Sequence, residues 1–190
     1  MKPEITLVLG GARSGKSALA ERIALASNMP VTYLATADVK DAEMAERVAV
    51  HKSRRPKEWR TWEGAPDTLP GDISEMSGLL LMDCLTMWLT RLFLATGDSE
   101  TEDEKKWEAR ELEIRALTEK LCGAAKDGTH LVIVSNEVGF GLVPPYLMGR
   151  RFRDMQGRMN QLCAQHASRV ALVVAGCPLW VKGTHEGLNI

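Results

Sequence analysis

Short runs of apolar residues recur along the chain, and polar or turn-forming residues separate them. The runs are rich in valine, isoleucine and leucine, with little alternation between apolar and polar positions. This pattern predicts strands that are buried on both faces, as is typical of parallel sheets. The strands predicted in this way are Ile5–Leu9, Val31–Thr36, Leu79–Asp83, Leu131–Val134 and Val170–Val174, and Trp180–Val181 is expected to add a short final one.

Between these runs the apolar positions follow helical periodicity. Thr101 and Glu104 have the spacing of a capping box, which predicts the start of a long amphipathic helix that passes Trp107 and Leu121. The other predicted helices are Ala18–Ala26, Asp41–His51, Leu85–Leu94 and Arg151–Ala167. Strands that alternate with helices indicate an α/β fold, with a mostly parallel sheet and helices on both of its faces.

The chain shows no internal repeat and no low-complexity segment. Its 190 residues, 45% of them hydrophobic, are enough for a buried core. We therefore expect a single domain over residues 1–190. Residues 54–78 and 139–145 are predicted to be loops, and residues 183–190 a flexible tail.

Residues 10–17 match the phosphate-binding loop pattern G-x-x-x-x-G-K-S. They follow a predicted strand and precede a predicted helix, so backbone N–H groups and a helix N-terminus can surround a phosphate. A glycine-rich turn that only happens to precede a helix is the weaker interpretation. We therefore expect the chain to bind a nucleoside triphosphate through Gly10, Gly11, Ala12, Arg13, Ser14, Gly15, Lys16 and Ser17.

The loop also predicts a Mg²⁺ site. Lys16 is expected to reach the β- and γ-phosphates, and the Ser17 hydroxyl to bind Mg²⁺. Such folds usually supply a metal carboxylate at the end of an apolar strand, and Asp83 has that position. Asp83 is also suited to be the N-cap of the helix that begins at Leu85, and the two roles are compatible.

Composition narrows the function classes. Lysine and arginine number 24 against 25 acidic residues, so a net charge of −1 argues against nucleic-acid binding and against a polybasic membrane anchor. The apolar runs are too short to span a bilayer, and the first residues lack the pattern of a signal peptide. Four widely spaced cysteines indicate neither a zinc site nor a disulfide framework. We expect a cytoplasmic protein with reduced thiols.

Further motifs come after the phosphate loop in a fixed order. They are Tyr33–Ala37, Asp41–Val48, His51–Pro56, Trp59–Glu63, Asp83–Thr86 and Ser135–Gly139. Together with the loop they closely resemble the bifunctional adenosylcobinamide kinase/adenosylcobinamide-phosphate guanylyltransferase family of cobalamin biosynthesis. The resemblance extends from about Thr6 to Lys182 and implies a P-loop fold similar to the RecA-like group.

The resemblance implies two reactions on one substrate. Adenosylcobinamide is phosphorylated with ATP or GTP, and GMP is then transferred from GTP to that phosphate, which yields adenosylcobinamide-GDP and pyrophosphate. In this family the second step passes through a GMP–histidine intermediate, and His51 stands at the matching position. A neutral imidazole is a good nucleophile, which suits the role. The family also forms trimers, in which the helix that bears the histidine reaches towards a neighbouring subunit.

Other site residues are implied by the resemblance. Ala35, Thr36 and Ala37 match a nucleotide-contacting segment, and Lys52, Ser53, Arg54 and Arg55 match a basic GTP-binding stretch. Glu63 matches an acidic residue associated with nucleotide binding, where it would select guanine, although a solvated loop charge is equally consistent. Asp83 stands where relatives often have glutamate. Asn136 and Glu137 come after a predicted strand at the ligand-binding edge and receive no role.

Some interpretations stay open beside this one. A P-loop small-molecule kinase without guanylyl transfer is the main alternative, and a nucleotide-dependent switch or motor is a more distant one. The basic stretch at Arg150, Arg151, Arg153 and Arg158 is expected to be a solvated helix face rather than a substrate contact. Structural roles are expected for His130 and His166, and core or subunit contacts for Trp88, Phe93 and Trp107.

Overall fold

The structure, a computed structural model, describes residues 3–38, 42–97, 101, 103–188 and 190. Within these ranges it leaves out the side chains of residues 43, 44, 47, 50, 51 and 54. The predicted helix start at Asp41 therefore lies outside the described residues, as do the side chains of His51 and Arg54.

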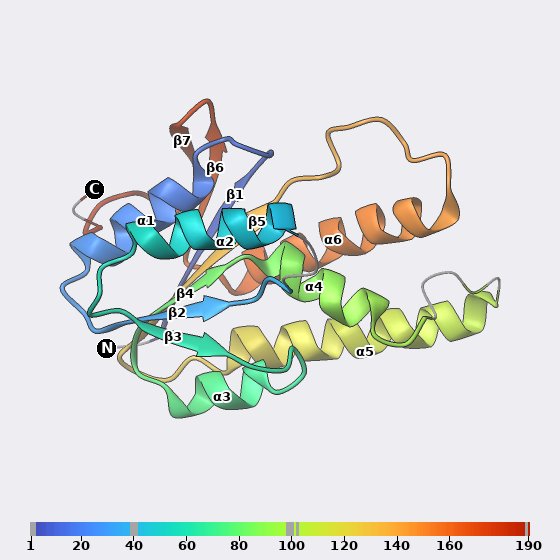
Figure 1. Cartoon of the computed structure of the whole chain (residues 1–190), viewed down its shortest axis with the longest axis horizontal. Helices are drawn as coiled ribbons and strands as arrows, with labels where there is room; N and C mark the ends of the chain where they lie inside the picture. The colour runs from blue at the N-terminus through green and yellow to red at the C-terminus, as the bar shows by residue number, and fades with distance from the viewer. Residues whose placement is uncertain (1–2, 39–41, 98–100, 102, 189) are drawn as a thin grey trace.

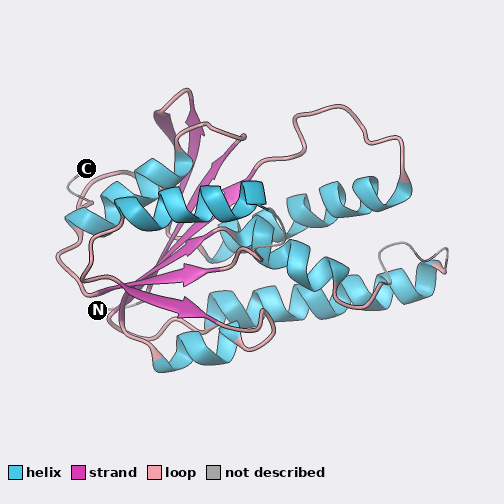
Figure 2. Cartoon of the chain, viewed as in Figure 1, coloured by secondary structure: helices cyan, strands magenta, loops and turns pink. Residues whose placement is uncertain are grey.

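In the described part of the chain, seven strands form one sheet in the order β3-β2-β4-β5-β1-β6-β7 (Figures 1 and 2). All neighbours run parallel except β7, which is antiparallel to β6. The six predicted strands are confirmed, and the last is longer than predicted. The strands are β1 (Glu4–Gly10), β2 (Val31–Ala35), β3 (Arg60–Glu63), β4 (Gly78–Asp83), β5 (Thr129–Asn136), β6 (Arg169–Val174) and β7 (Cys177–Lys182).

Helices cover both faces of the sheet, as predicted (Figure 1). On one face lie α1 (Lys16–Ala26) and α2 (Ala42–Arg54). The other face carries α3 (Leu69–Glu75), α4 (Leu85–Leu94), α5 (Glu104–Gly123) and α6 (Leu147–His166). Connections through helices are what parallel strands require.

The core has two layers, because successive side chains of a strand point to opposite faces of the sheet. Leu7, Leu80 and Ile133 face the layer of α3 to α6, whereas their neighbours Val8 and Leu81 face α1. All five side chains are buried. The unbroken apolar runs of the sequence therefore mark strands covered on both sides.

The prediction of a loop over residues 54–78 is wrong, because this stretch contains β3 and α3. β3 is an edge strand of four residues, and only its Trp62 is partly buried, so the sequence carries little apolar signal there. α3 has seven residues and contains Pro70 in its first turn, a position where proline is tolerated. The prolines and polar residues of this stretch therefore belong to a short helix and an exposed strand as well as to the turns between them.

The N-terminus of α5 differs from the capping-box prediction. Asp103 is the N-cap, and its carboxylate accepts hydrogen bonds from the backbone N–H groups of Lys105 and Lys106. Thr101 lies two residues upstream, where its hydroxyl accepts from the Asp103 N–H at 3.2 Å. Threonine and aspartate are both favourable N-cap residues. The capping-box spacing between Thr101 and Glu104 therefore predicted Thr101 as the N-cap, whereas the structure has Asp103.

The predicted solvated face on α6 is wrong for one of its arginines. Arg151 is only 6% exposed, pairs with Glu104 at 2.9 Å and donates to the Thr101 carbonyl at 2.6 Å. Its guanidinium also lies over the Trp107 ring. This side chain ties the start of α5 to α6 and is structural.

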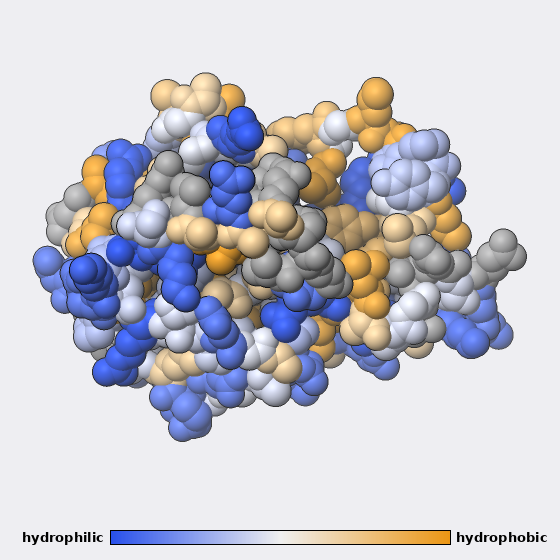
Figure 3. All heavy atoms as spheres, in the orientation of Figure 1, coloured by the Kyte–Doolittle hydropathy of each residue, from blue (hydrophilic) through white to orange (hydrophobic). Residues whose placement is uncertain are grey.

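The predictions for the two remaining segments have different outcomes. Residues 139–145 form a loop, as predicted, and Figure 3 shows apolar side chains along this raised segment between β5 and α6. The prediction of a flexible tail over residues 183–190 is wrong in part, because Leu188 is buried and packs in the core layer beside α1.

Candidate nucleotide-binding site

The phosphate loop joins the carboxyl end of β1 to the N-terminus of α1. Arg13 and Gly15 adopt positive φ angles of 57° and 97°. Gly15 is the N-cap of α1, and it provides no side chain that could accept from the first turn of that helix. The N–H groups of a first turn, together with the helix dipole, form an anion-binding site. The local backbone therefore has the form that phosphate binding needs.

Backbone contacts from neighbouring elements hold this loop in place. The Gly176 N–H, from the turn between β6 and β7, donates to the Ser14 carbonyl at 2.8 Å. The Glu137 N–H donates to the Gly10 carbonyl at 3.1 Å. At Gly10 a Cβ atom would come within 2.7 Å of the Val173 carbonyl oxygen, so a side chain does not fit there. The glycines of the motif thus allow close packing against β6 as well as the turn.

Lys16 folds back over the loop. Its side chain is only 9% exposed, and Nζ donates to the Gly11 carbonyl at 3.0 Å. This places a cationic group at the loop, as the motif predicts for a lysine that binds β- and γ-phosphates.

A cavity of about 980 Å³ opens beside the loop. It brings together segments that lie far apart in the sequence: the phosphate loop, the end of β2, α2, the end of β3, and the carboxyl ends of β4 and β5. Parallel α/β sheets bind ligands at this edge. The predicted site residues in its lining are Ala12, Arg13, Ser14, Gly15, Lys16, Ser17, Ala35, Thr36, Ala37, Lys52, Arg55, Glu63 and Asp83.

The structure does not bring every predicted residue into this lining. Gly10 and Gly11 of the phosphate loop are not among the residues that line the cavity. Ser53 of α2 is not among them either. The side chains of His51 and Arg54 lie outside the described residues, although both positions belong to α2. Other residues that were not predicted as site residues also line the cavity, among them Glu21, Met87 and Arg91. Asn136, which the sequence placed at the ligand-binding edge without a role, lines it as well.

The wall next to Asp83 is tightly fixed. The Thr36 hydroxyl donates to the Cys84 carbonyl at 2.8 Å, and the Thr36 hydroxyl oxygen accepts from the Cys84 N–H at 2.9 Å. Cys84 is the N-cap residue of α4, so the alternative in which Asp83 caps that helix is wrong. The Asp83 carboxyl stands at the end of β4 and lines the cavity.

Cys84 itself is unsuited to be a nucleophile. Burial raises the pKa of its thiol to about 11, and the negative charge of Asp83 adds to the effect. The thiol is therefore protonated at neutral pH, and a thiol is a much weaker nucleophile than a thiolate.

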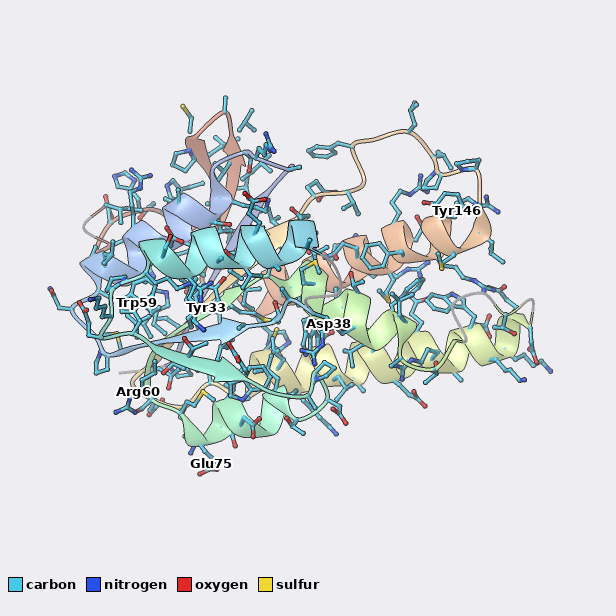
Figure 4. The ribbon with its side chains drawn as sticks, viewed as in Figure 1. Tyr33, Asp38, Trp59, Arg60, Glu75 and Tyr146 are labelled. Atoms are coloured by element: carbon cyan, nitrogen blue, oxygen red, sulfur yellow. The ribbon has the colours of Figure 1, made fainter. Side chains whose placement is uncertain are left out.

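Tyr33 and Arg55 connect β2 to the segment that comes after α2. The Arg55 guanidinium carbon lies 3.2 Å from the centre of the Tyr33 ring, a cation–π contact. The Tyr33 hydroxyl donates to the Asp83 carbonyl at 3.2 Å, and burial raises the pKa of Tyr33. Figure 4 labels Tyr33 and Asp38 between α2 and the strands. Arg55 is thereby held in the cavity wall as a fixed cation.

Glu63 ends the edge strand β3 and lines the outer part of the cavity. It is paired in register with Ala35, and its side chain is exposed. Arg91 of α4 donates to the carbonyl of the next residue, Gly64, at 3.1 Å. The turn after Glu63 is therefore fixed to α4. No sequence motif indicated Arg91, because its contact depends on the packing of α4 beneath β3.

The cavity contains oxygen donors that suit Mg²⁺. Ser17 lies in the first turn of α1 and Asp83 ends β4, and both line the cavity beside the phosphate loop. Mg²⁺ typically binds to one or two protein oxygens and completes its coordination with substrate phosphates and water. The described residues contain no group of three or more His, Cys, Asp or Glu side chains that could hold a metal on their own.

The remaining predictions concern residues outside the cavity. His130 is buried, bonds through Nε2 to the Thr6 hydroxyl at 2.9 Å, and is structural as predicted. His166 pairs with Glu119 at 2.7 Å. Trp88, Phe93 and Trp107 are all buried in the core, which confirms that prediction. The four cysteines are free, and no described helix is long and apolar enough to cross a membrane.

The fold and the loop place this chain among the P-loop nucleotide-binding proteins of the RecA-like type. A solved structure of a prototypical ATPase from the type III secretion system of pathogenic bacteria superposes with a TM-score of 0.50 and 13% identity. The superposition covers 89% of this chain and 50% of that one, and shows the fold alone.

The sequence comparisons give the family. The profile of the cobinamide kinase/cobinamide phosphate guanyltransferase family matches residues 6–181, and the chain belongs to this family. It is 42% identical to the bifunctional adenosylcobalamin biosynthesis protein CobP of Pseudomonas aeruginosa, over 93% of this chain and 96% of that protein. It is 38% identical to the protein CobU of Escherichia coli, over 93% and 98%. The chain is therefore an enzyme of the transferase class, with the kinase and guanylyltransferase activities that define the family.

Proposed function

We propose that the chain phosphorylates adenosylcobinamide with ATP or GTP and then transfers GMP from GTP to that phosphate through a guanylylated His51. Family membership supports the pair of reactions. The single observation that carries the site assignment is the cavity, in which the phosphate loop, Asp83 and the α2 residue Lys52 lie around one space.

In the kinase step the aminopropanol hydroxyl of the substrate attacks the γ-phosphorus, and the nucleoside diphosphate leaves. Phosphoryl transfer depends on positioning and on neutralising the charge of the phosphates. Lys16 supplies a cation at the loop, and Arg55, held over the Tyr33 ring, supplies a second one in the cavity lining. Mg²⁺ would be held by Ser17 and Asp83, and it would neutralise charge on the terminal phosphates.

In the guanylyl step an imidazole nitrogen of His51 attacks the α-phosphorus of GTP, and pyrophosphate leaves. A phosphate oxygen of the phosphorylated substrate then attacks the same phosphorus, and the histidine is released. Each displacement forms one P–N or P–O bond and breaks another. Dividing the transfer into two displacements lets one pocket serve the donor and the acceptor in turn.

The helical spacing of α2 supports His51 for this role. Val48, Lys52 and Arg55, on α2 and just beyond it, line the cavity. Position 51 comes three residues after Val48, and positions at this spacing share one face of a helix. Lys52 and Arg55 would bind the triphosphate, and their positive charge disfavours imidazolium, so the nucleophilic lone pair stays available.

The test is incubation with Mg²⁺ and GTP labelled at the α-phosphate, followed by denaturation. We expect a label on the protein that acid removes and base does not. The variant His51→Ala should lose this adduct and the guanylyltransferase activity, whereas kinase activity should largely persist because γ-phosphoryl transfer needs no protein nucleophile.

The matched control is His166→Ala, which removes a histidine that pairs with Glu119 outside the cavity. This variant should keep both the adduct and the activity. A label on another residue, or full guanylyl transfer without His51, contradicts the assignment. Kinase activity of the wild-type protein without any adduct would instead identify a small-molecule kinase.

A further inference from the structure

A cluster of buried polar side chains lies behind the carboxyl end of β5. Its members are Thr86 of α4, Ser135 of β5, and Gln156 and Asn160 of α6. Ser135 and Gln156 have no exposed surface, and Asn160 and Thr86 are 4% and 7% exposed. The surrounding layer is apolar. Buried polar side chains cost stability unless they are hydrogen-bonded, so their placement here calls for a reason.

Hydrogen bonds within the cluster orient one amide. Ser135 donates its hydroxyl proton to Asn160 Oδ1 at 2.7 Å. Gln156 Nε2 donates to the same Oδ1 and to the Ser135 hydroxyl oxygen, both at 3.0 Å. With Oδ1 fixed by two donors, Asn160 Nδ2 must point the other way.

Two of the hydrogen bonds that leave the cluster end on Asn136. The Asn136 N–H donates to the Thr86 hydroxyl oxygen at 2.9 Å, and Asn160 Nδ2 donates to the Asn136 carbonyl at 3.1 Å. The two peptide groups of Asn136 are thus held from two different helices. Asn136 is also the last residue of β5, so these side-chain contacts add to its pairing with Gly10 at the end of the sheet.

Asn136 ends the strand that lies between β1, which leads into the phosphate loop, and β4, which ends at Asp83. It is in register with Gly10 at the start of the phosphate loop, and two residues earlier Val134 is in register with Asp83. It also lines the cavity. In a P-loop protein, the space between the loop lysine and the metal carboxylate is where the terminal phosphate of the nucleotide lies.

We propose that the Asn136 side-chain amide donates to the terminal phosphate of the bound triphosphate, and that Thr86 and Asn160 are positioning residues that hold it there. This inference rests on the nucleotide-binding part of the proposed function. A neutral amide at this point distinguishes a triphosphate from a diphosphate without adding charge. The cluster thereby makes α4 and α6 part of the nucleotide site, although neither positioning side chain touches the nucleotide.

The test measures dissociation constants for GDP and for a GTP analogue with a non-hydrolysable β–γ bridge, in the presence of Mg²⁺. The readout is the preference for the triphosphate, the ratio of the two constants. In Asn136→Ala this preference should fall about tenfold, the usual effect of one hydrogen bond to a charged group. Thr86→Val should lower it in the same direction, and Thr86→Ser, which keeps the hydroxyl, should restore it.

A double variant separates positioning from general stability. If Asn160 acts through Asn136, Asn160→Leu lowers the preference in the wild-type background and has no further effect in Asn136→Ala. The matched control is Thr118→Val, which removes a fully buried hydroxyl from α5. Thr118→Val should lose some resistance to urea but keep the preference. Thr86→Val is the milder probe if Asn160→Leu does not fold.

Three results overturn the inference. They are an unchanged preference in Asn136→Ala, independent and additive effects of Asn136→Ala and Asn160→Leu, and a loss of preference in Thr118→Val equal to that in Thr86→Val. Wild-type protein measured in parallel distinguishes a failure of this inference from a failure of the proposed function. If it binds neither nucleotide, the proposed function fails as well. If it binds GTP and phosphorylates adenosylcobinamide while the variants keep its preference, only this inference fails.

Discussion

At the scale of single residues, the chemistry of the site depends on a few side chains that the fold brings together from distant segments. Lys16 and Asp83 are 67 positions apart by number, yet both line one cavity. Glu63 reaches the same cavity from an edge strand. Each of these side chains has a different expected partner, namely the phosphates for Lys16, Mg²⁺ for Asp83 and the base for Glu63, so substitutions can separate their roles.

Glu63 is expected to read the base. Its carboxylate can accept from the N1–H and 2-amino groups of guanine, which adenine lacks. Glu63→Gln should weaken GTP binding about tenfold and narrow the preference for GTP over ATP, because a charged hydrogen bond is lost. Competition titrations with both nucleotides measure this. Glu58→Gln is the control, since Glu58 is exposed and lies outside the cavity lining; equal selectivity in both variants would make Glu63 a solvated loop charge.

His130 should make stability depend on pH. Burial lowers the pKa of this imidazole below its ordinary value, and Glu4 opposes this effect while Arg169 adds to it. The unfolded chain then binds more protons than the folded one below the ordinary histidine pKa of about 6.5. The contribution of His130 is therefore complete above that pH and is lost as the pH falls below it, by at most about 1.4 kcal/mol per pH unit.

Urea unfolding at a series of pH values from neutral to mildly acidic tests this sign. His130→Gln keeps a hydrogen-bonding side chain but does not titrate, so its stability should fall less steeply with decreasing pH than that of the wild type. Parallel slopes for the two proteins would contradict the prediction. His166→Ala is the comparison for a histidine that pairs with a carboxylate nearer the surface, at Glu119.

The sequence predicted the residues of the phosphate loop because their function is local: eight consecutive residues determine the turn and the helix start. It did not predict Arg91 or a role for Asn136. Arg91 acts on the Gly64 carbonyl across 27 positions, and Asn136 is held by side chains from α4 and α6. No spacing in one sequence reveals such contacts.

At the scale of elements, apolar content decided which predictions were confirmed. The strands buried on both faces, such as β1 and β5, have continuous apolar runs and were predicted from them. β3 is an exposed edge strand, and α3 has only seven residues, so neither carries a clear period. Their existence depends on pairing with β2 and packing against α5, which are tertiary effects.

The start of α5 offers a test of a corrected element boundary. Asp103→Ala should destabilise the protein by about 1 kcal/mol, because the first-turn N–H groups of Lys105 and Lys106 lose their acceptor. Thr101→Ala should cost less, since among the described residues the Thr101 hydroxyl accepts from the Asp103 N–H and from no first-turn N–H of α5. Chemical denaturation of both variants gives the ranking. The reverse ranking would restore the capping box predicted from the sequence, and Asp103→Asn should retain most of the stability.

At the scale of the whole molecule, the order of the strands creates the site. β1 lies between β5 and β6, and β4 lies between β2 and β5, so the carboxyl ends of β1, β5 and β4 are consecutive at one edge. The sequence predicted that an α/β sheet would form, but not which strands would be neighbours. Periodicity reports the burial of each strand and carries no information on its partners. The trimer implied by the resemblance likewise stays a prediction.

One cavity is expected to serve both reactions. The structure places the phosphate loop and the cavity-lining residues of α2 around a single space, so the triphosphate would be held by Lys16 whether its γ- or its α-phosphorus is attacked. Lys16→Ala should then lower kinase activity by about 100-fold, the scale of losing one charge-stabilising group, and also slow the formation of the GMP adduct.

Initial rates of phosphorylation and of adduct formation, measured on the same preparation, test this shared site. Arg22→Ala is the control, because Arg22 is an exposed cation on the same helix and does not line the cavity. It should change neither rate. A Lys16→Ala protein that loses phosphorylation but forms the adduct at the normal rate would require a second triphosphate site. If both rates fall together, the two activities depend on one loop, and the histidine of α2 acts on the nucleotide that this loop holds.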